Sequence, residues 1–441
     1  MKRKFSRRRF LAASSSVLVA GGLQAQDAKD APTPEDRLAL HGGKKAVQER
    51  LPRLVRWGEP ERERLNSMLG QDSLFYWQGP QTKLLTERFR QTCPRKYVMT
   101  CSSGTAALHI AVAAAGIAPG DEVITSPITD IGTVIGVLYQ QAVPVFADLG
   151  RNTYNLDPAD VGRRITPKTK AIIAVHLTGN PCPMDALKVL ADKHGLVLIE
   201  DCAQAWGARY RGQPIGTIGH IACFSLQNSK QVTCGDGGIV ASSDERFGPR
   251  LQRYGDKGFD RLDKSGLFNA FATNYRMSEP QAAVAAAQLT RVEKISAKRS
   301  RLGNLLTEKI AGLPGIEPHQ VRADDRCTYW FYMLRVRPGA LRCERAEFVK
   351  ALAAEGVPAS AGYIRVPLYG NPVFQKHGFF AGRWPLKEMG LTSMDYTKVS
   401  CPETESILKT GVRVTIHEGM SEEYVLSVAA AFRKVARHYA V

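Results

Sequence analysis

The 441-residue sequence lacks the signatures of several protein classes. It contains no internal repeat, no low-complexity tract, and no apolar run long enough for an ordinary membrane span. Its nine cysteines include no CxxC pair, so neither a zinc site nor a dithiol redox pair is indicated, and no metal is expected. Blocks of like charge with interleaved aromatic residues are absent, which leaves nucleic-acid binding unsupported. The 44% hydrophobic composition is ordinary for a globular chain of two or three domains.

The amino terminus has no acidic residue before Asp27 but carries six lysines and arginines. Ser6 to Leu11 forms a twin-arginine pattern, followed by an apolar stretch and by small residues around Ala25. Residues 1–26 therefore predict a twin-arginine signal segment and a periplasmic or secreted protein. A basic disordered tail and an uncleaved membrane anchor are the alternatives. Without those six charges the net charge falls from +18 to +12, a balance that suits anionic small molecules.

The rest of the chain divides into three predicted parts. Residues 27–70 indicate a linker with a short helix, 71–300 a large α/β domain, and 301–441 a smaller α+β domain. In the large domain, helical stretches fall between strand-like runs, which predicts a mainly parallel sheet with helices on both faces. The expected strands are Tyr97–Ser102, Glu122–Ser126, Val143–Asp148, Ala171–Leu177, Leu196–Asp201, Ile221–Leu226 and Gly238–Ser242.

Lys230 follows one of these strands and precedes a glycine-rich turn. A lysine amine condenses with an aldehyde only when part of its population is neutral, and a desolvated pocket lowers its pKa enough to allow this. Ser225, at the end of the preceding strand, would donate its hydroxyl to a phosphate. The pattern favours an aldehyde cofactor held by Lys230 as a Schiff base, although a surface lysine before a hairpin turn would look similar.

Three further stretches suit a cofactor that bears a phosphate. Ser102 to Ala106 ends one strand and opens a helix, so its amides and hydroxyls form an anion site. Asp201 ends another strand, where its carboxylate would pair with a protonated ring nitrogen. Asn274 to Met277 precedes a long helix and would reach a phosphate outside its own site. Each stretch alone has a plain explanation as a cap, a turn or a solvated arginine. Together, and in this order, they fit a pyridoxal-phosphate enzyme of the aspartate-aminotransferase fold.

A set of longer motifs supports the same interpretation. They are GPQTKLLTERF, SSGTAALHIA, GDEVITSPIT, VHLTGNPCPMD, IEDCAQAWGA, CFSLQNSKQVTCGDGG and NYRMSEPQAA. Over about Gly42 to Lys434 the sequence resembles the DegT-type sugar aminotransferases, fold type I enzymes that act on keto sugars and keto cyclitols.

That resemblance implies pyridoxal 5'-phosphate (PLP) as the cofactor and gives residues their roles. Lys230 would form the Schiff base, Asp201 would pair with the pyridine nitrogen, and Gln204 would lie near the ring. Asn274, with Arg276 beside it, would reach the phosphate of the neighbouring subunit, which implies a two-fold dimer with sites at the interface. The positions assigned to the phosphate are Gly104, Thr105, Ala106 and Ser225.

Two positions depart from the family pattern. Many members carry an aromatic residue that stacks on the cofactor where this chain has Asp130, and a carboxylate cannot supply that stacking. Asp130 therefore becomes a candidate substrate residue, with a helix cap as its alternative role. Gln227 stands where the family often has histidine, and together with the PLYGNPVF stretch it is closer to the keto-cyclitol branch.

The predicted function is transfer of an amino group from glutamate or glutamine to a keto sugar or keto cyclitol, by a homodimer that is not stably inserted in a membrane. One alternative is a pyridoxamine-dependent sugar dehydratase, but related dehydratases replace the lysine with histidine. The other alternative is a PLP-binding, sensor-like protein without catalysis. A visible absorbance band that shifts when an amino donor is added would separate an enzyme from a passive binder.

The twin-arginine pattern generates a direct prediction about export. Replacing both Arg7 and Arg8 by lysine should leave the precursor in the cytoplasm, because the export pathway recognises the arginine pair. Cell fractionation and immunoblotting of the wild type and the double variant measure this. Export of the double-lysine form at the wild-type level would refute the twin-arginine interpretation.

Overall fold

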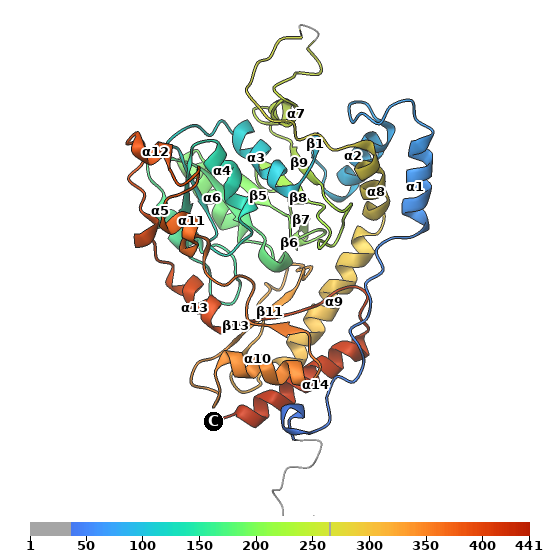
Figure 1. The fold of residues 1–441 in the computed structure, drawn as a ribbon, viewed down its shortest axis with the longest axis vertical. Coiled ribbons are helices and arrows are strands. Elements are labelled where there is room, and N and C mark those ends of the chain that lie inside the picture. Colours follow the sequence, from blue (N-terminus) through green and yellow to red (C-terminus); the bar gives the residue numbers. More distant parts are fainter. Residues whose placement is uncertain (1–36, 264–265) are drawn as a thin grey trace, which may run out of the picture.

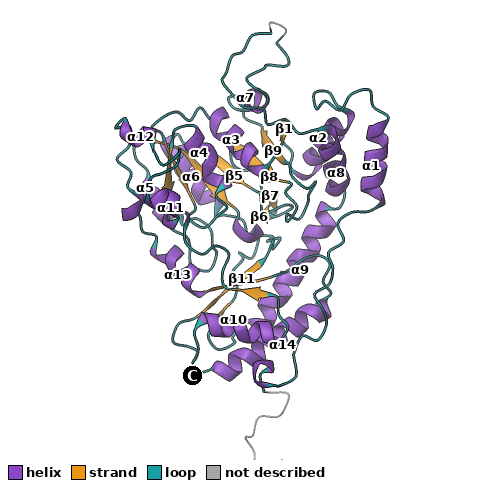
Figure 2. Cartoon of the chain, in the orientation of Figure 1, coloured by secondary structure: helices purple, strands orange, loops and turns teal. Residues whose placement is uncertain are grey.

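A seven-stranded sheet forms the centre of the computed structural model, which describes residues 37–263 and 266–441 (Figures 1 and 2). The strand order is β1-β9-β8-β5-β4-β2-β3, and β9 runs antiparallel to both of its neighbours while the remaining pairings are parallel. All seven expected strands are present, so the predicted fold class is confirmed. Their bounds are β1 Tyr97–Cys101, β2 Glu122–Thr125, β3 Val143–Phe146, β4 Thr169–Val175, β5 Val197–Asp201, β8 Ile221–Ser225 and β9 Gly238–Ser242.

Helices that alternate with these strands pack against the sheet. Helices α3, α4 and α7 contact β8, β9, β1 and β3, whereas α5 and α6 pack together and α6 lies against β4 and β5. Helices α1 and α2 pack on α8 beside this domain (Figure 1). The bounds are α1 Glu59–Leu69, α2 Pro80–Thr92, α3 Gly104–Ala114, α4 Gly132–Tyr139, α5 Pro158–Arg164, α6 Met184–His194, α7 Gly248–Gly255 and α8 Glu279–Leu289; β6 Arg209–Tyr210 and β7 Gln213–Pro214 form a separate hairpin.

Local sequence explains where the helices nearest the site begin. The Ser103 side chain accepts a hydrogen bond from the amide of Ala106 and so caps α3. Helix α8 begins after Ser278, which forms a capping box with Gln281. The long helix expected after Glu279 is two helices, because the chain breaks at Thr290 before α9 (Val292–Ile310) starts.

A smaller antiparallel sheet with the order β10-β11-β13-β12 lies at the other end of α9 (Figure 1). Helices α9, α10 and α14 pack around this sheet and form a second apolar core. The bounds are β10 Ile316–Glu317, β11 Tyr332–Val336, β12 Ala359–Ser360, β13 Gly411–Val414, α10 Arg345–Ala354 and α14 Glu422–Tyr439.

Two segments connect the two sheets. The arm formed by residues 37–58 starts on the small core, where Leu38 and Val47 are buried, and ends at the first turn of α1. Residues 368–408 follow β12 but pack on the core of the large sheet, and they contain only short elements. Those elements are α11 Pro372–Gln375, α12 Pro385–Glu388, α13 Pro402–Thr410 and the 3-10 turns Leu368–Gly370 and Tyr396–Lys398; two further such turns are Ala39–His41 and Leu177–Gly179.

The predicted signal segment, residues 1–26, lies outside the described residues. Within residues 37–263 and 266–441, no helix has both the length and the apolarity needed to cross a membrane. All nine cysteines lie in this range and carry free thiols. Cys101, Cys202 and Cys223 are fully buried beside the central strands, where they pack as small hydrophobic side chains.

Candidate active site

A pocket of about 350 Å³ lies at the carboxyl ends of the central strands. Such an edge is where open α/β sheets bind ligands. The strands β5 and β8 deliver Asp201 and Ser225 to it, and the loop after β8 delivers Lys230. The lining residues are Ser103, Gly104, Thr105, Leu108, Thr129, Asp130, Gly132, Thr133, Asp201, Ala203, Gln204, Ser225, Gln227, Ser229, Lys230, Asp236 and Trp330.

Lys230 is the amine of this pocket. Its side chain is 8% exposed, and burial lowers its pKa to about 8, although the carboxylates of Asp201 and Asp130 oppose the shift. The backbone around it is held on both sides: its amide donates to the carbonyl of Gln227, and its carbonyl accepts a 2.6 Å hydrogen bond from Arg56. A substantial fraction of the Lys230 amine is therefore neutral near pH 8, as nucleophilic attack on a carbonyl requires.

Asp201 is the buried carboxylate of the pocket. One oxygen accepts a 2.9 Å hydrogen bond from the hydroxyl of Thr133, and the other accepts a 3.1 Å bond from the amide of Ala203. Burial raises the pKa of Asp201, while these two hydrogen bonds and the charge of Lys230 act in the opposite direction. A buried carboxylate without a directly bonded cation stabilises a protonated ring nitrogen placed beside it.

A cradle for an anion forms where α3 begins. Its first turn presents backbone amides that have no acceptor within the helix. The cradle is closely packed: a Cβ built on Gly104 would lie 2.7 Å from the Cβ of Ser225, and one on Gly238 would lie 2.2 Å from the carbonyl oxygen of Ser103. Gly104, Thr105 and Ser225 line the pocket, whereas Ala106 does not, and its amide is bonded to the Ser103 hydroxyl.

Gln204 lines the pocket, and hydrogen-bond partners on both ends of its side-chain amide fix its position. Its amide oxygen accepts a 2.9 Å hydrogen bond from the backbone of Thr178, a residue with a positive φ of 62°. Its amide nitrogen lies 3.5 Å from the hydroxyl of Tyr363. Gln227, the other departure noted in the sequence, also lines the pocket, and its oxygen accepts bonds from the amide and the hydroxyl of Ser229.

Asp130 lines the pocket and also serves as a cap. One of its oxygens accepts a 2.8 Å hydrogen bond from the amide of Gly132 at the start of α4. Its charge opposes the lowering of the Lys230 pKa by burial and adds to the raising of the Tyr363 pKa by burial, so Asp130 lies within electrostatic range of both. The cap uses only one of the two carboxylate oxygens, and the side chain stays exposed.

Asn274 and Arg276 do not line the pocket of their own chain. The oxygen of Asn274 accepts a 2.8 Å hydrogen bond from Arg276, and Arg276 lies 3.3 Å from the buried carboxylate of Asp256. The neighbouring Tyr275 carbonyl accepts from the amide of Ser102, which ties this segment to the back of the anion cradle.

Among the residues not predicted from the sequence, three contact Lys230, its loop or Asp201. The indole ring of Trp330 lies 3.7 Å from the Lys230 amine and donates to the carbonyl of Ser229. Thr133 orients Asp201, and Arg56 reaches the Lys230 loop from the amino-terminal arm. Only Thr133 had a sequence signal, since it lies in the first turn of the helix that follows the SPIT motif.

His176, Glu200 and Cys202 form a buried cluster. His176 follows β4, whereas Glu200 and Cys202 are the chain neighbours of Asp201 at the end of β5. Glu200 accepts hydrogen bonds from the amides of Gly216, Ile218 and Gly219, and His176 lies 3.2 Å from it. These bonds already use the carboxylate oxygens of Glu200. The cluster therefore anchors the loop before β8 to β5, and it fixes the strand that carries Asp201.

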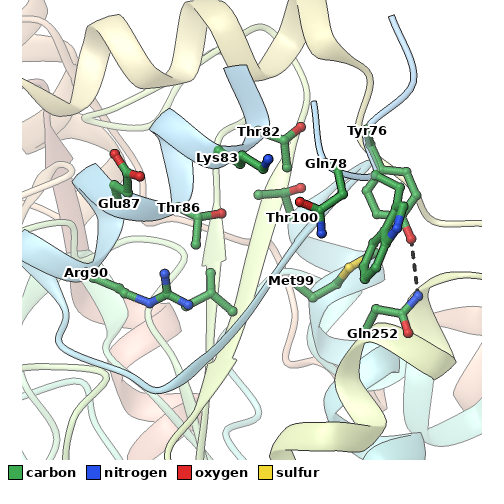
Figure 3. A pocket seen from close by; sticks show the side chains of 12 residues that line it. Tyr76, Gln78, Thr82, Lys83, Thr86, Glu87, Arg90, Met99, Thr100 and Gln252 are labelled. Carbon is green, nitrogen blue, oxygen red and sulfur yellow. Dashed lines mark hydrogen bonds between the residues drawn. The ribbon is translucent and has the colours of Figure 1, made fainter. Parts of the chain in front are cut away.

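A second pocket, of about 200 Å³, lies between α2 and the edge strand β1 (Figure 3). Tyr76 and Gln252 border one side, where the Gln252 amide donates to the Tyr76 hydroxyl, and Lys83 and Thr100 lie near the middle. None of the site residues expected from the sequence lines this pocket.

Comparison with known proteins places the chain in a family. The model of the DegT/DnrJ/EryC1/StrS aminotransferase family matches residues 57–433. The chain is 39% identical to the GDP-perosamine synthase of Caulobacter vibrioides over 61% of its length and 72% of that protein. It is 34% identical to the L-glutamine:2-deoxy-scyllo-inosose aminotransferase of Streptomyces paromomycinus over 78% of its length and 84% of that protein. Its fold is similar to that of an aminotransferase from Psychrobacter cryohalolentis, with a TM-score of 0.78, 29% identity, and coverage of 87% and 98%.

The chain therefore belongs to the DegT/DnrJ/EryC1/StrS aminotransferase family. The resemblance expected from the motifs is confirmed, and so is the enzyme class, a PLP-dependent sugar aminotransferase of fold type I.

The lowered pKa of Lys230 generates a prediction that can be tested without catalytic turnover. In cofactor-free protein, the rate at which PLP is captured should rise with pH around a midpoint near 8, because only the neutral amine attacks the aldehyde. A lysine with an unperturbed pKa would give a midpoint of about 10.4. Stopped-flow absorbance measures the rate, and borohydride reduction with peptide mapping identifies the labelled residue. Lys230→Ala serves as the control, and a label on any other lysine would overturn the assignment.

Proposed function

We propose that this protein moves an amino group from L-glutamate or L-glutamine to a keto sugar or a keto cyclitol, with PLP bound to Lys230. The observation that carries the proposal is that Lys230 and Asp201 line one pocket together with the α3 anion cradle. Burial lowers the pKa of the amine and raises that of the carboxyl group. The donor and the acceptor follow from relatives that act as an L-glutamine aminotransferase and as a GDP-perosamine synthase.

The residues present fit PLP. Gly104, Thr105 and Ser225 would hold its phosphate, since the glycine leaves room for close approach and the helix terminus favours negative charge. Asp201 would hold a proton at the ring nitrogen. When bound, PLP supplies an electron-withdrawing ring that stabilises negative charge at the carbon next to the transferred nitrogen.

Lys230 has two roles in the proposed reaction. Its amine would hold the cofactor and, when free, would act as the base that accepts the proton from the donor α-carbon and passes it to the carbon at the other end of the reacting C–N unit. A pKa near 8 suits this work, because the amine then accepts and releases a proton near neutral pH. Trp330 and the Arg56 hydrogen bond restrict the loop that carries Lys230, which keeps the amine over the same position.

The active unit would be a homodimer. Asn274 is exposed and does not face its own pocket, as expected for a residue that reaches the phosphate in the neighbouring subunit. The loop after α7 projects away from the large sheet and exposes Leu262, Phe268 and Phe271 (Figure 1). Phe271 is fully exposed in the single chain. Large exposed apolar side chains grouped on one loop favour contact with another protein surface, here a second copy.

Export through the twin-arginine pathway is part of the proposal. That pathway carries folded proteins, so the enzyme would bind PLP before it leaves the cytoplasm. The protein would then be periplasmic or secreted, or anchored if the signal segment is retained.

The proposed function predicts activity on a defined panel. Purified protein loaded with PLP should convert keto sugars or keto cyclitols to amines when glutamate or glutamine is supplied, and Lys230→Ala should not. Mass spectrometry of the products measures both. A wild-type protein that binds PLP but transfers no amino group from either donor to any acceptor would favour the sensor-like alternative.

Asp130 generates a prediction about the acceptor. Its free carboxylate oxygen is expected to bind a substrate hydroxyl, so Asp130→Asn should slow the acceptor half-reaction by about ten- to a hundredfold, or 1.5–3 kcal/mol. The donor half-reaction and the visible absorbance should be nearly unchanged, because asparagine retains an oxygen that can accept from Gly132 and Asp130 acts on the Lys230 pKa less than Asp201 does. Single-turnover kinetics measures both halves. Equal slowing of the two half-reactions, with a lower melting temperature, would show that Asp130 acts only as the cap of α4.

A further inference from the structure

The pocket between α2 and β1 shares no lining residue with the Lys230 pocket (Figure 3). Among the described strands, β1 pairs only with β9, so it ends the large sheet. Helix α2 packs over that end, and a pocket of about 200 Å³ remains between the helix and the strand. A cavity of about 150 Å³ holds benzene, so this pocket has room for one ligand of about ten non-hydrogen atoms.

Thr100 supplies a buried hydroxyl to this pocket. Its side chain is 2% exposed, and its Oγ1 makes no hydrogen bond within residues 37–263 and 266–441. Figure 3 shows Thr100 between Lys83 and Gln78, in the middle of the lining. A buried hydroxyl without a partner costs free energy, which a ligand atom bonded to it recovers. The pocket therefore offers a hydrogen bond that the described chain does not use.

Two cations line the same pocket. Lys83 and Arg90 are two turns apart on α2, so their side chains share one face of the helix. Arg90 donates to the carbonyls of Arg95 and Lys96, and neither cation pairs with a carboxylate in the part of the chain that the structure describes. Glu87 is the one acidic residue of the lining. Two cations and one carboxylate leave a net charge of +1, which suits a monoanion.

The other side of the pocket is an aromatic wall (Figure 3). The rings of Tyr76 and Trp77 have centres 6.1 Å apart, and Met99 on β1 is buried beside them. The Tyr76 hydroxyl donates to the buried carboxylate of Asp256 and accepts a 3.2 Å bond from Gln252, so the wall is fixed in place. A flat apolar body gains contact area and ring packing against such a wall.

We propose that this pocket binds a small aromatic carboxylate, as a ligand site separate from the Lys230 pocket. The carboxylate would accept hydrogen bonds from the Thr100 hydroxyl and the Lys83 ammonium group. The ring would pack on Trp77 and Met99. The inference does not rest on the proposed function, because it concerns other residues and requires no turnover.

The test is calorimetric titration of the PLP-loaded protein with benzoate, which should show saturable binding. Lys83→Gln should weaken that binding by about ten- to a hundredfold, as expected for loss of a charge-assisted hydrogen bond. Thr100→Val keeps the shape of the side chain and should weaken binding by about two- to tenfold, as expected for loss of a neutral hydrogen bond. The melting temperature of ligand-free Thr100→Val should not fall, because this variant removes a buried hydroxyl that has no partner.

Two further ligands separate the charge from the ring. Benzamide has the ring without the charge, and acetate has the charge without the ring, so each should bind at least about tenfold more weakly than benzoate. Benzamide binding should also be insensitive to Lys83→Gln. Equal affinity for benzoate and either of these ligands would overturn the inference.

Lys193→Gln is the matched control, because Lys193 is an exposed lysine of α6 that does not line the pocket. It should leave benzoate binding unchanged. Benzoate binding that both Lys83→Gln and Thr100→Val leave unchanged would lie elsewhere, for example in the Lys230 pocket, and would overturn the inference. Absence of saturable binding would do the same, as would a crystal structure grown with benzoate in which only water contacts Thr100.

Discussion

The site depends on the burial of an amine and a carboxyl group in one pocket without a direct bond between them. Burial lowers the pKa of Lys230 to about 8 and raises that of Asp201. Below pH 8 the buried, charged Lys230 lowers the free energy of unfolding. Between pH 8 and the ordinary lysine pKa, the folded protein has lost this proton while the unfolded chain still binds it. The contribution of Lys230 to the free energy of unfolding therefore rises with pH in that window. Such a cost persists only where the surrounding structure fixes both groups, as the Thr133 and Ala203 bonds to Asp201 and the Arg56 bond to the Lys230 loop do.

The second constraint is that the site needs both sheets. The large sheet supplies the anion cradle, Asp201 and Lys230, all at strand ends. Trp330 and Tyr363 come from the part of the chain that builds the small sheet, and their rings are 5.8 Å apart. Relative movement of the two sheets would therefore separate Lys230 from Trp330 and Tyr363. The arm of residues 37–58, which is held on the small core and bonded to the Lys230 loop, restricts that movement.

The sequence predicted the parts of this structure that local patterns encode. The seven central strands alternate with helices, and Lys230, Asp201 and the Ser102 to Ala106 turn follow individual strands, so strand ends brought them together. Trp330 and Tyr363 could not be predicted, because their approach to the pocket depends on how the small sheet docks, and no periodicity encodes docking. The aromatic side chains of residues 368–408 complete the large core, and this contact too depends on how distant parts of the chain dock.

Asp130, which stands where many family members carry an aromatic residue, affects which proposed acceptor the pocket suits. An aromatic residue at this position would make an apolar wall, whereas Asp130 presents a carboxylate oxygen that the helix cap does not use. Gln227 and Ser229 add polar groups on the loop that carries Lys230. Polar groups in a pocket favour ligands that can hydrogen-bond to them, because a ligand lacking such groups would leave them desolvated and unpaired. The polarity of these walls therefore supports the proposed polyhydroxylated acceptor over an apolar carbonyl compound.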